Sequence, residues 1–165
     1  MKNNKGFSLI ELIIVLAIIA VLGGVMWMGF QSVGSRQVNQ CTNNIESFLG
    51  RTKTLALAKD AAKVRIYRND DGYYADIYVG SAAAPETTKK IGTDSLAVSY
   101  VTNDSAVTAF SVGTQLELSF QRDSGAFTAL GGGSTGVYCV EIQVIKGDYE
   151  RSVKMIPETG KYFVE

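Results

Sequence analysis

The pattern of apolar and polar residues begins with one long uninterrupted apolar stretch. From Leu12 to Phe30 no residue carries a charge or a side-chain amide or hydroxyl group, and nearly all residues up to Leu22 are Leu, Ile or Val. A helix needs roughly 20 mostly apolar residues to cross a bilayer. The stretch therefore predicts a transmembrane helix over residues 7–30.

A second helical pattern follows the apolar stretch. Its apolar positions are spaced by three and four residues, which places them on one face of a helix. They are Val38, Cys41, Ile45, Phe48, Thr52 and Leu55. We expect an amphipathic helix over residues 31–62 that continues the first helix and covers one face of a folded domain.

Four glycines lie where these two helical segments join. Gly23, Gly24, Gly29 and Gly34 each lower helix propensity by about 1 kcal/mol relative to alanine, which favours local melting of the helix. Small residues also let two helices pack closely, which is a different reason for their presence. Both interpretations are open from the sequence.

After residue 62 the apolar period changes from helical to two, as in β-strands. Val64–Arg68 and Tyr73–Val79 predict a hairpin around the turn 69–72. In a later strand, Val137–Lys146, alternation places Tyr138, Val140, Ile142 and Val144 on one face. The other predicted strands are Lys89–Ile91, Leu96–Val101, Gln115–Gln121, Tyr149–Met155 and Lys161–Val164. The expected fold class is α+β, with a long N-terminal helix packed on an antiparallel β-sheet domain over residues 63–165.

Composition excludes several classes of function. Lysine plus arginine and aspartate plus glutamate both number 16, so the net charge is zero, and the chain has no histidine. A Ser-His-Asp hydrolase is excluded, and no nucleophile-base pair, cofactor motif or metal-ligand motif stands out. Cys41 and Cys139 are too few for a zinc site. They could form one disulfide or remain two buried thiols, and both alternatives are open. We therefore expect a protein that is not an enzyme.

The junction before the apolar stretch has a distinctive order of residues, Lys5-Gly6-Phe7-Ser8-Leu9-Ile10-Glu11-Leu12. A short basic leader and a glycine precede an aromatic residue, and one carboxylate precedes the aliphatic run. This segment resembles the class III leader junction of type IV prepilins and type II secretion pseudopilins. The resemblance implies that residues 1–6 are a leader, and that a prepilin peptidase cuts between Gly6 and Phe7 and N-methylates the new amine.

Glu11 is the ionisable residue at the start of the apolar stretch, and a carboxylate inside a membrane is costly without a partner. The resemblance implies that it meets the N-terminal amine of a neighbouring subunit during assembly. The alternative is a glutamate at the headgroup boundary. Lys2 and Lys5 precede the stretch, which favours a cytoplasmic N-terminus and a C-terminal domain outside the cytoplasm.

The order of elements adds a second resemblance. Residues 51–58 end the helix, Val64–Tyr67 open a hairpin, and Gly160–Val164 form a closing strand, which is similar to minor pseudopilin H and the fimbrial T minor pilins. The resemblance implies a structural subunit of a type II secretion pseudopilus or type IV pilus. Its partners would be other subunits, the peptidase, the inner membrane and an assembly platform. Alternatives are a competence pseudopilin for DNA uptake and an uncleaved, membrane-anchored binding module.

Three other groups of residues could suggest binding sites. Asn69, Asp70 and Asp71 lack the full calcium-loop pattern and fit a hairpin turn better, so no metal is expected. The basic residues are interleaved with acidic ones in the C-terminal part, so DNA is not an expected partner. The tyrosines have the spacing of cross-strand pairs. The basic residues are Lys63, Arg65, Arg151, Lys154 and Lys161, and the tyrosines are Tyr67, Tyr73, Tyr74 and Tyr78.

Overall fold

The structure is a computed structural model that describes residues 9–58, 61–131 and 136–165, and for residues 23–33 it describes the backbone alone. The chain divides into two compact units at Gly34 and Ser35. Residues up to 34 form the first unit and residues 35–165 form the second, which we call the body.

One α-helix, α1, runs from Leu9 to Ala58 and contributes to both units. Its backbone is helical at Gly23, Gly24, Gly29 and Gly34, so local melting at these glycines is not part of the structure. The helix ends at Ala58 and the first strand begins at Ala62, both inside the segment 31–62 that the sequence assigned to amphipathic helix.

The body contains two antiparallel sheets, which corrects the expectation of a single sheet. Sheet A has the strand order β3-β2-β1-β6, and sheet B has the order β5-β4-β7-β8-β9. Sheet A consists of β1 (Ala62–Asn69), β2 (Gly72–Val79), β3 (Thr87–Thr93) and β6 (Gln115–Ser119). Sheet B consists of β4 (Ala97–Thr102), β5 (Val107–Ala109), β7 (Cys139–Lys146), β8 (Tyr149–Ile156) and β9 (Lys161–Val164). Strand β5 was not predicted.

Short turns with glycine set the register of the predicted hairpins. β1 and β2 pair from Ala62 with Val79 to Asn69 with Gly72, so only Asp70 and Asp71 lie in the turn. Gly147 has a φ of 59° where β7 turns into β8, and Gly160 has a φ of 61° before β9. Glycine adopts positive φ without the clash of a Cβ atom, which is why the chain reverses at these positions.

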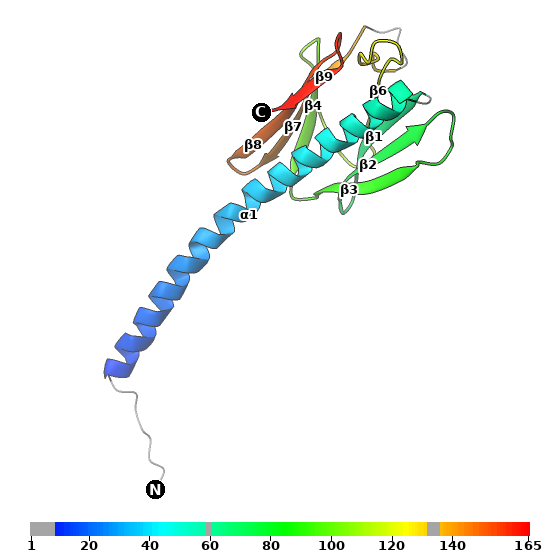
Figure 1. Cartoon of the computed structure of the whole chain (residues 1–165). Helices are drawn as coiled ribbons and strands as arrows, with labels where there is room; N and C mark the ends of the chain where they lie inside the picture. The colour runs from blue at the N-terminus through cyan, green and yellow to red at the C-terminus, as the bar shows by residue number, and fades with distance from the viewer. Residues whose placement is uncertain (1–8, 59–60, 132–135) are drawn as a thin grey trace. The chain divides into compact units, whose positions relative to one another are not determined.

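The core of the body lies between the C-terminal part of α1 and the two sheets, and Figure 1 shows this part of the helix crossing both of them. The predicted apolar face of the helix is confirmed, because Val38, Cys41, Ile45, Phe48 and Thr52 are all buried, while Leu55 is half-buried. The buried face is wider than predicted. It also includes Thr42, Leu49 and Ala56.

Polar side chains on α1 form hydrogen bonds, some within the helix and others with the rest of the body. The buried hydroxyls of Thr42 and Thr52 donate to the carbonyls of Val38 and Phe48, at 2.9 and 2.7 Å. Each therefore avoids the cost of an unsatisfied buried polar group. Lys53 Nζ donates to the Gly160 carbonyl of the turn before β9 at 2.8 Å, so the helix is also tied to sheet B through a polar contact.

A β-bulge changes which residues of β7 face the core. Thr102 pairs with Cys139 and Val101 pairs with Glu141, so Val140 is an extra residue on β7. The bulge shifts the alternation by one position. Cys139, Ile142 and Val144 are consequently buried, whereas Val140 is half-buried. The predicted face is right for Ile142 and Val144 and wrong for Tyr138 and Val140.

Two glycine-containing turns meet beside Lys53 and Leu57 of α1. Gly125 and Gly160 are both buried and both have positive φ, 68° and 61°. A Cβ atom on Gly160 would lie 1.7 Å from the Gly125 carbonyl oxygen. Next to this contact, Phe127 N donates to the Pro157 carbonyl at 2.9 Å. The segment after β6 is thereby held against the turn that precedes β9.

Candidate functional site

The N-terminal part of α1 is the candidate site for assembly, and Glu11 lies in the first turn of this helix. The large aliphatic side chains from Leu9 to Leu22 are all exposed, with exposed fractions between 45% for Val15 and 77% for Leu9. Glu11 is exposed as well. A helix that is apolar on all sides requires an apolar environment. Within the described part of the first unit, no other residues cover these side chains.

The first-turn position of Glu11 has an electrostatic consequence. The N-terminal end of a helix carries a partial positive charge, so a carboxylate there stabilises the helix by about 0.3–1 kcal/mol when exposed. Gly6 and Phe7, the predicted processing residues, lie outside the described residues. Within residues 9–58, 61–131 and 136–165, the structure contains no helix with a stretch long and apolar enough to pass through a bilayer.

The two cysteines lie in the core and are not joined in the structure. Cys41 is close to the backbone of β3, since a Cβ atom on Gly92 would lie 3.0 Å from its sulfur. Cys139 Sγ donates to the Glu141 carbonyl at 3.6 Å. Burial raises the pKa of each thiol to about 12. Of the two alternatives left open by the sequence, the structure contains the pair of buried thiols.

A labelling experiment distinguishes the two alternatives for Cys41 and Cys139. Because the thiolate is the reactive form and both pKa values are about 12, we expect neither cysteine of the folded protein to react appreciably with iodoacetamide at pH 8. Both should react after unfolding in urea without a reductant, as measured by intact mass. Glutathione under the same conditions serves as the reactive control. If the unfolded chain takes up label only after reduction, the two cysteines form a disulfide.

The exposed face of sheet A carries one predicted cross-strand tyrosine pair, whereas Tyr73 is buried in the core and pairs with Arg68. Tyr67 pairs with Tyr74 across the strands, and their rings are stacked with centroids 5.8 Å apart. Arg65 and Lys63 both bind Glu117 on β6, at 2.7 and 3.2 Å. The cross-strand interpretation of these two tyrosines is confirmed, and the two neighbouring positive charges share one carboxylate.

The residues that suggested a calcium loop form a tight turn. Asp71 Oδ2 accepts hydrogen bonds from Tyr74 Oη at 2.7 Å and Lys90 Nζ at 2.9 Å. These donors lower the pKa of the Asp71 carboxyl. In the described part of the chain, no three His, Cys, Asp or Glu side chains are grouped as a metal site would require.

The basic residues considered for DNA binding do not form one patch. Lys63 and Arg65 lie on sheet A, whereas Arg151, Lys154 and Lys161 lie on sheet B. Lys154 pairs with Glu165 at 2.5 Å, and Arg151 Nη1 donates to Asn39 Oδ1 of α1 at 3.0 Å. In the described chain, Arg151 and Lys154 are therefore engaged in contacts with other residues of the protein.

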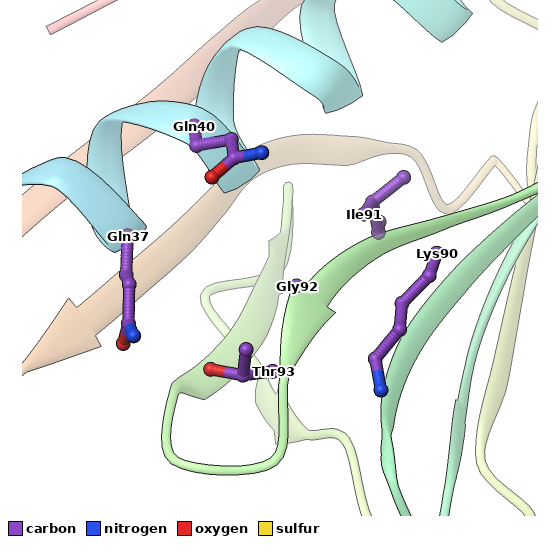
Figure 2. Close-up of a pocket in the computed structure, with 6 residues that line it drawn as sticks. All are labelled: Gln37, Gln40, Lys90, Ile91, Gly92 and Thr93. Carbon is purple, nitrogen blue, oxygen red and sulfur yellow. The ribbon is translucent and has the colours of Figure 1, made fainter.

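A small pocket lies where the body begins, between α1 and the end of β3, with a volume of about 200 Å³. Figure 2 shows Gln37 and Gln40 on the helix opposite Gly92 and Thr93, with Ile91 pointing toward the helix and Lys90 pointing away from it. Ile91 is buried, and its carbonyl accepts from Asn44 Nδ2 at 3.2 Å. None of the predicted site residues lines this pocket.

The polar contacts between α1 and the sheets were missed from the sequence. Asn44 and Lys53 fall beside the apolar stripe, and they bind carbonyl groups of Ile91 and Gly160 that are far away in sequence. The apolar Leu49, next to the predicted stripe position Phe48, was a signal in the sequence that the buried face is wider and that neighbouring polar positions also touch the sheets.

Residues 1–27 match the family model described as the prokaryotic N-terminal methylation motif. The match spans the Gly6–Phe7 junction, Glu11 and most of the apolar stretch. The N-terminal part of the chain therefore carries a prepilin-type motif. The body, in which α1 packs on two antiparallel sheets, confirms the predicted α+β fold class.

Two solved structures similar to this chain are crystal forms of the type IV minor pilin FimU from Pseudomonas aeruginosa strain PAO1. In one, the sequences are 16% identical, the match covers 79% of this chain and 89% of that chain, and the TM-score is 0.49. In the other, the sequences are 18% identical, the match covers 77% of this chain and 91% of that chain, and the TM-score is 0.47. No curated protein matches the sequence.

Proposed function

We propose that this protein is a structural subunit of a filament of the type IV pilus or type II secretion pseudopilus kind, and that it acts by polymerising and not by catalysis. One observation carries the proposal. The N-terminal methylation motif coincides with a helix whose aliphatic side chains from Leu9 to Leu22 are all exposed. Such a surface is stable in water only when lipid or other apolar helices cover it.

Two environments would cover this helix in turn. Before assembly, the apolar run Leu12–Phe30 is proposed to anchor the chain in the inner membrane, with the body outside the cytoplasm. After assembly, the same surface is proposed to pack against the helices of other subunits. The proposal covers a pilus and a secretion pseudopilus alike, because both use this surface in the same way.

Glu11 is proposed to direct assembly by pairing with the Phe7 amine of a neighbouring subunit. An isolated charge costs several kcal/mol in an apolar environment, and two opposite charges together offset much of that cost. The proposal requires that a prepilin peptidase first removes Met1–Gly6, because the α-amine of Phe7 does not exist before cleavage. Methylation of this amine keeps it basic and preserves the pairing.

Processing is tested by intact-mass analysis of protein extracted from membranes. In cells that contain a prepilin peptidase, we expect the mass to be lower by residues Met1–Gly6 and higher by one methyl group. A Gly6→Leu variant is the matched control, because a bulky side chain should block close approach of the peptidase to the bond after residue 6. Full-length protein in the presence of an active peptidase would contradict the proposed function.

A further inference from the structure

A second pocket, independent of the N-terminal helix, lies at the end of sheet A. Its volume is about 420 Å³, within the range of small-molecule sites. Tyr67 and Arg65 of β1, Asp76 of β2 and Gln115 of β6 line it, with Asn69 and Arg68 at the end of β1. All of these residues belong to the body, so the pocket does not depend on filament assembly.

Tyr67 presents one ring face to this pocket. β1 lies between β2 and β6, and Tyr67 pairs with Tyr74 on one side and Gln115 on the other. The Tyr74 ring covers one face of Tyr67, with the two planes only 21° apart. The opposite face is therefore directed toward Gln115 and the pocket. A flat ligand placed there would extend the stack of the two tyrosines.

The pocket offers both acceptors and donors to such a ligand. Asp76 Oδ1 accepts hydrogen bonds from the hydroxyls of Thr88 and Tyr67, at 2.7 and 3.4 Å. Its second oxygen, Oδ2, is therefore left as an acceptor for a ligand. Asn69 and Gln115 are exposed and supply amide donors and acceptors. The Arg68 side chain lies on the other face of β1, where Nη1 donates to the Phe110 carbonyl at 3.1 Å and the guanidinium lies over the buried Tyr73 ring, so it does not supply a donor here.

The charge balance favours an uncharged ligand. Arg65 Nε and Nη2 both donate to Glu117 Oε1, at 2.9 and 2.7 Å, and Lys63 pairs with the same carboxylate at 3.2 Å. On this face of the sheet the two positive charges of Lys63 and Arg65 are therefore matched by the two negative charges of Glu117 and Asp76. A phosphate backbone needs a surplus of positive charge, and this face of the sheet has none.

We propose that this pocket binds a neutral sugar residue of a polysaccharide or glycan. The C–H groups of a sugar ring carry partial positive charge and pack on the negative face of Tyr67. Its hydroxyl groups act as donor and acceptor at once, which suits Asp76 Oδ2 and the two amides. A nucleobase would also stack on Tyr67, but the nucleic acid to which it belongs would bring the phosphates that this charge balance disfavours.

Saturation-transfer NMR on the full chain tests the proposal, in micelles of a detergent without a sugar headgroup. The probes are the methyl glycosides of glucose, galactose and N-acetylglucosamine, with thymidine and inorganic phosphate as competitors for the same pocket. We expect at least one glycoside to bind with a dissociation constant on the order of 1 mM, since few polar contacts are available. Thymidine is expected to give no signal, and neither thymidine nor phosphate should reduce the signal of the bound glycoside.

Variants locate the binding. Tyr67→Ala should weaken it at least about tenfold, whereas Tyr67→Phe keeps the ring and should retain it within about threefold. Gln115→Ala, at an exposed position, serves as a second variant if Tyr67→Ala perturbs the fold. Tyr149→Ala, at an exposed tyrosine of sheet B, is the matched control and should bind like the wild type.

Three results would overturn the proposal. The first is the absence of binding by all three glycosides, and the second is glycoside binding that neither Tyr67→Ala nor Gln115→Ala weakens. The third is binding of thymidine without any glycoside, which would assign the pocket to nucleobases. None of these results affects the proposed processing or assembly, which are measured separately by mass and by filament composition.

Discussion

A Glu11→Ala subunit is expected to enter filaments at least about tenfold less often than the wild type when both are co-expressed, because breaking a charge pair in an apolar environment costs about 3–5 kcal/mol. Membrane insertion should be unchanged or slightly improved, since the substitution removes a charge from the apolar run. Cleavage after Gly6 should also persist. Filament composition is measured by mass spectrometry of sheared filaments, normalised to the membrane pool of each subunit.

Two further substitutions separate charge from shape at this position. Glu11→Gln keeps the size of the side chain and should fail like Glu11→Ala, whereas Glu11→Asp keeps the charge and should be incorporated better than either. Equal incorporation of wild type and Glu11→Ala, with matched cleavage and membrane levels, would leave Glu11 as a residue of the headgroup boundary.

The largest effect on stability is expected for Gly160→Ala. A Cβ atom at this position would lie 1.7 Å from the Gly125 carbonyl oxygen, and the φ of 61° is itself unfavourable for alanine. Strain and overlap together should lower the free energy of unfolding by about 4 kcal/mol or more. The measurement is urea unfolding of the body, residues 35–165, followed by circular dichroism.

Gly147→Ala is the matched control for this prediction. Gly147 has nearly the same φ, 59°, but nothing lies within 4 Å of the place where its Cβ atom would be. Only the backbone strain applies, so the expected loss is about 1–2 kcal/mol. Similar losses for the two variants would mean that the contact between Gly125 and Gly160 does not support the fold.

The elements that the sequence predicted well are those with a strong local signal. α1 follows from its apolar spacing, and the β1–β2 and β7–β8 hairpins follow from short turns between alternating strands. Strand β5 has only three residues and is held by pairing with β4, so its own sequence shows little periodicity. Short segments of this kind become strands through tertiary pairing.

Features that depend on long-range pairing could not be predicted. The division into two sheets is set by which strands pair, for example β1 with β6, and residue spacing does not encode that choice. The bulge at Val140 moved Cys139 onto the core face, against the simple alternation. The junction motif was recognised because its chemistry is local, whereas the pocket beside Tyr67 required the register of three strands.

The contacts that α1 makes with the last strands have a consequence for when the protein folds. Lys53 binds the carbonyl of Gly160 and Asn39 binds Arg151, so residues made early contact residues made more than 100 positions later. The apolar face of the helix stays uncovered until the C-terminal strands have left the ribosome, and such non-local contacts form slowly. Synthesis of the C-terminal strands is therefore expected to precede folding of the body. An exported subunit would cross the membrane as an unfolded chain and acquire its structure on the far side.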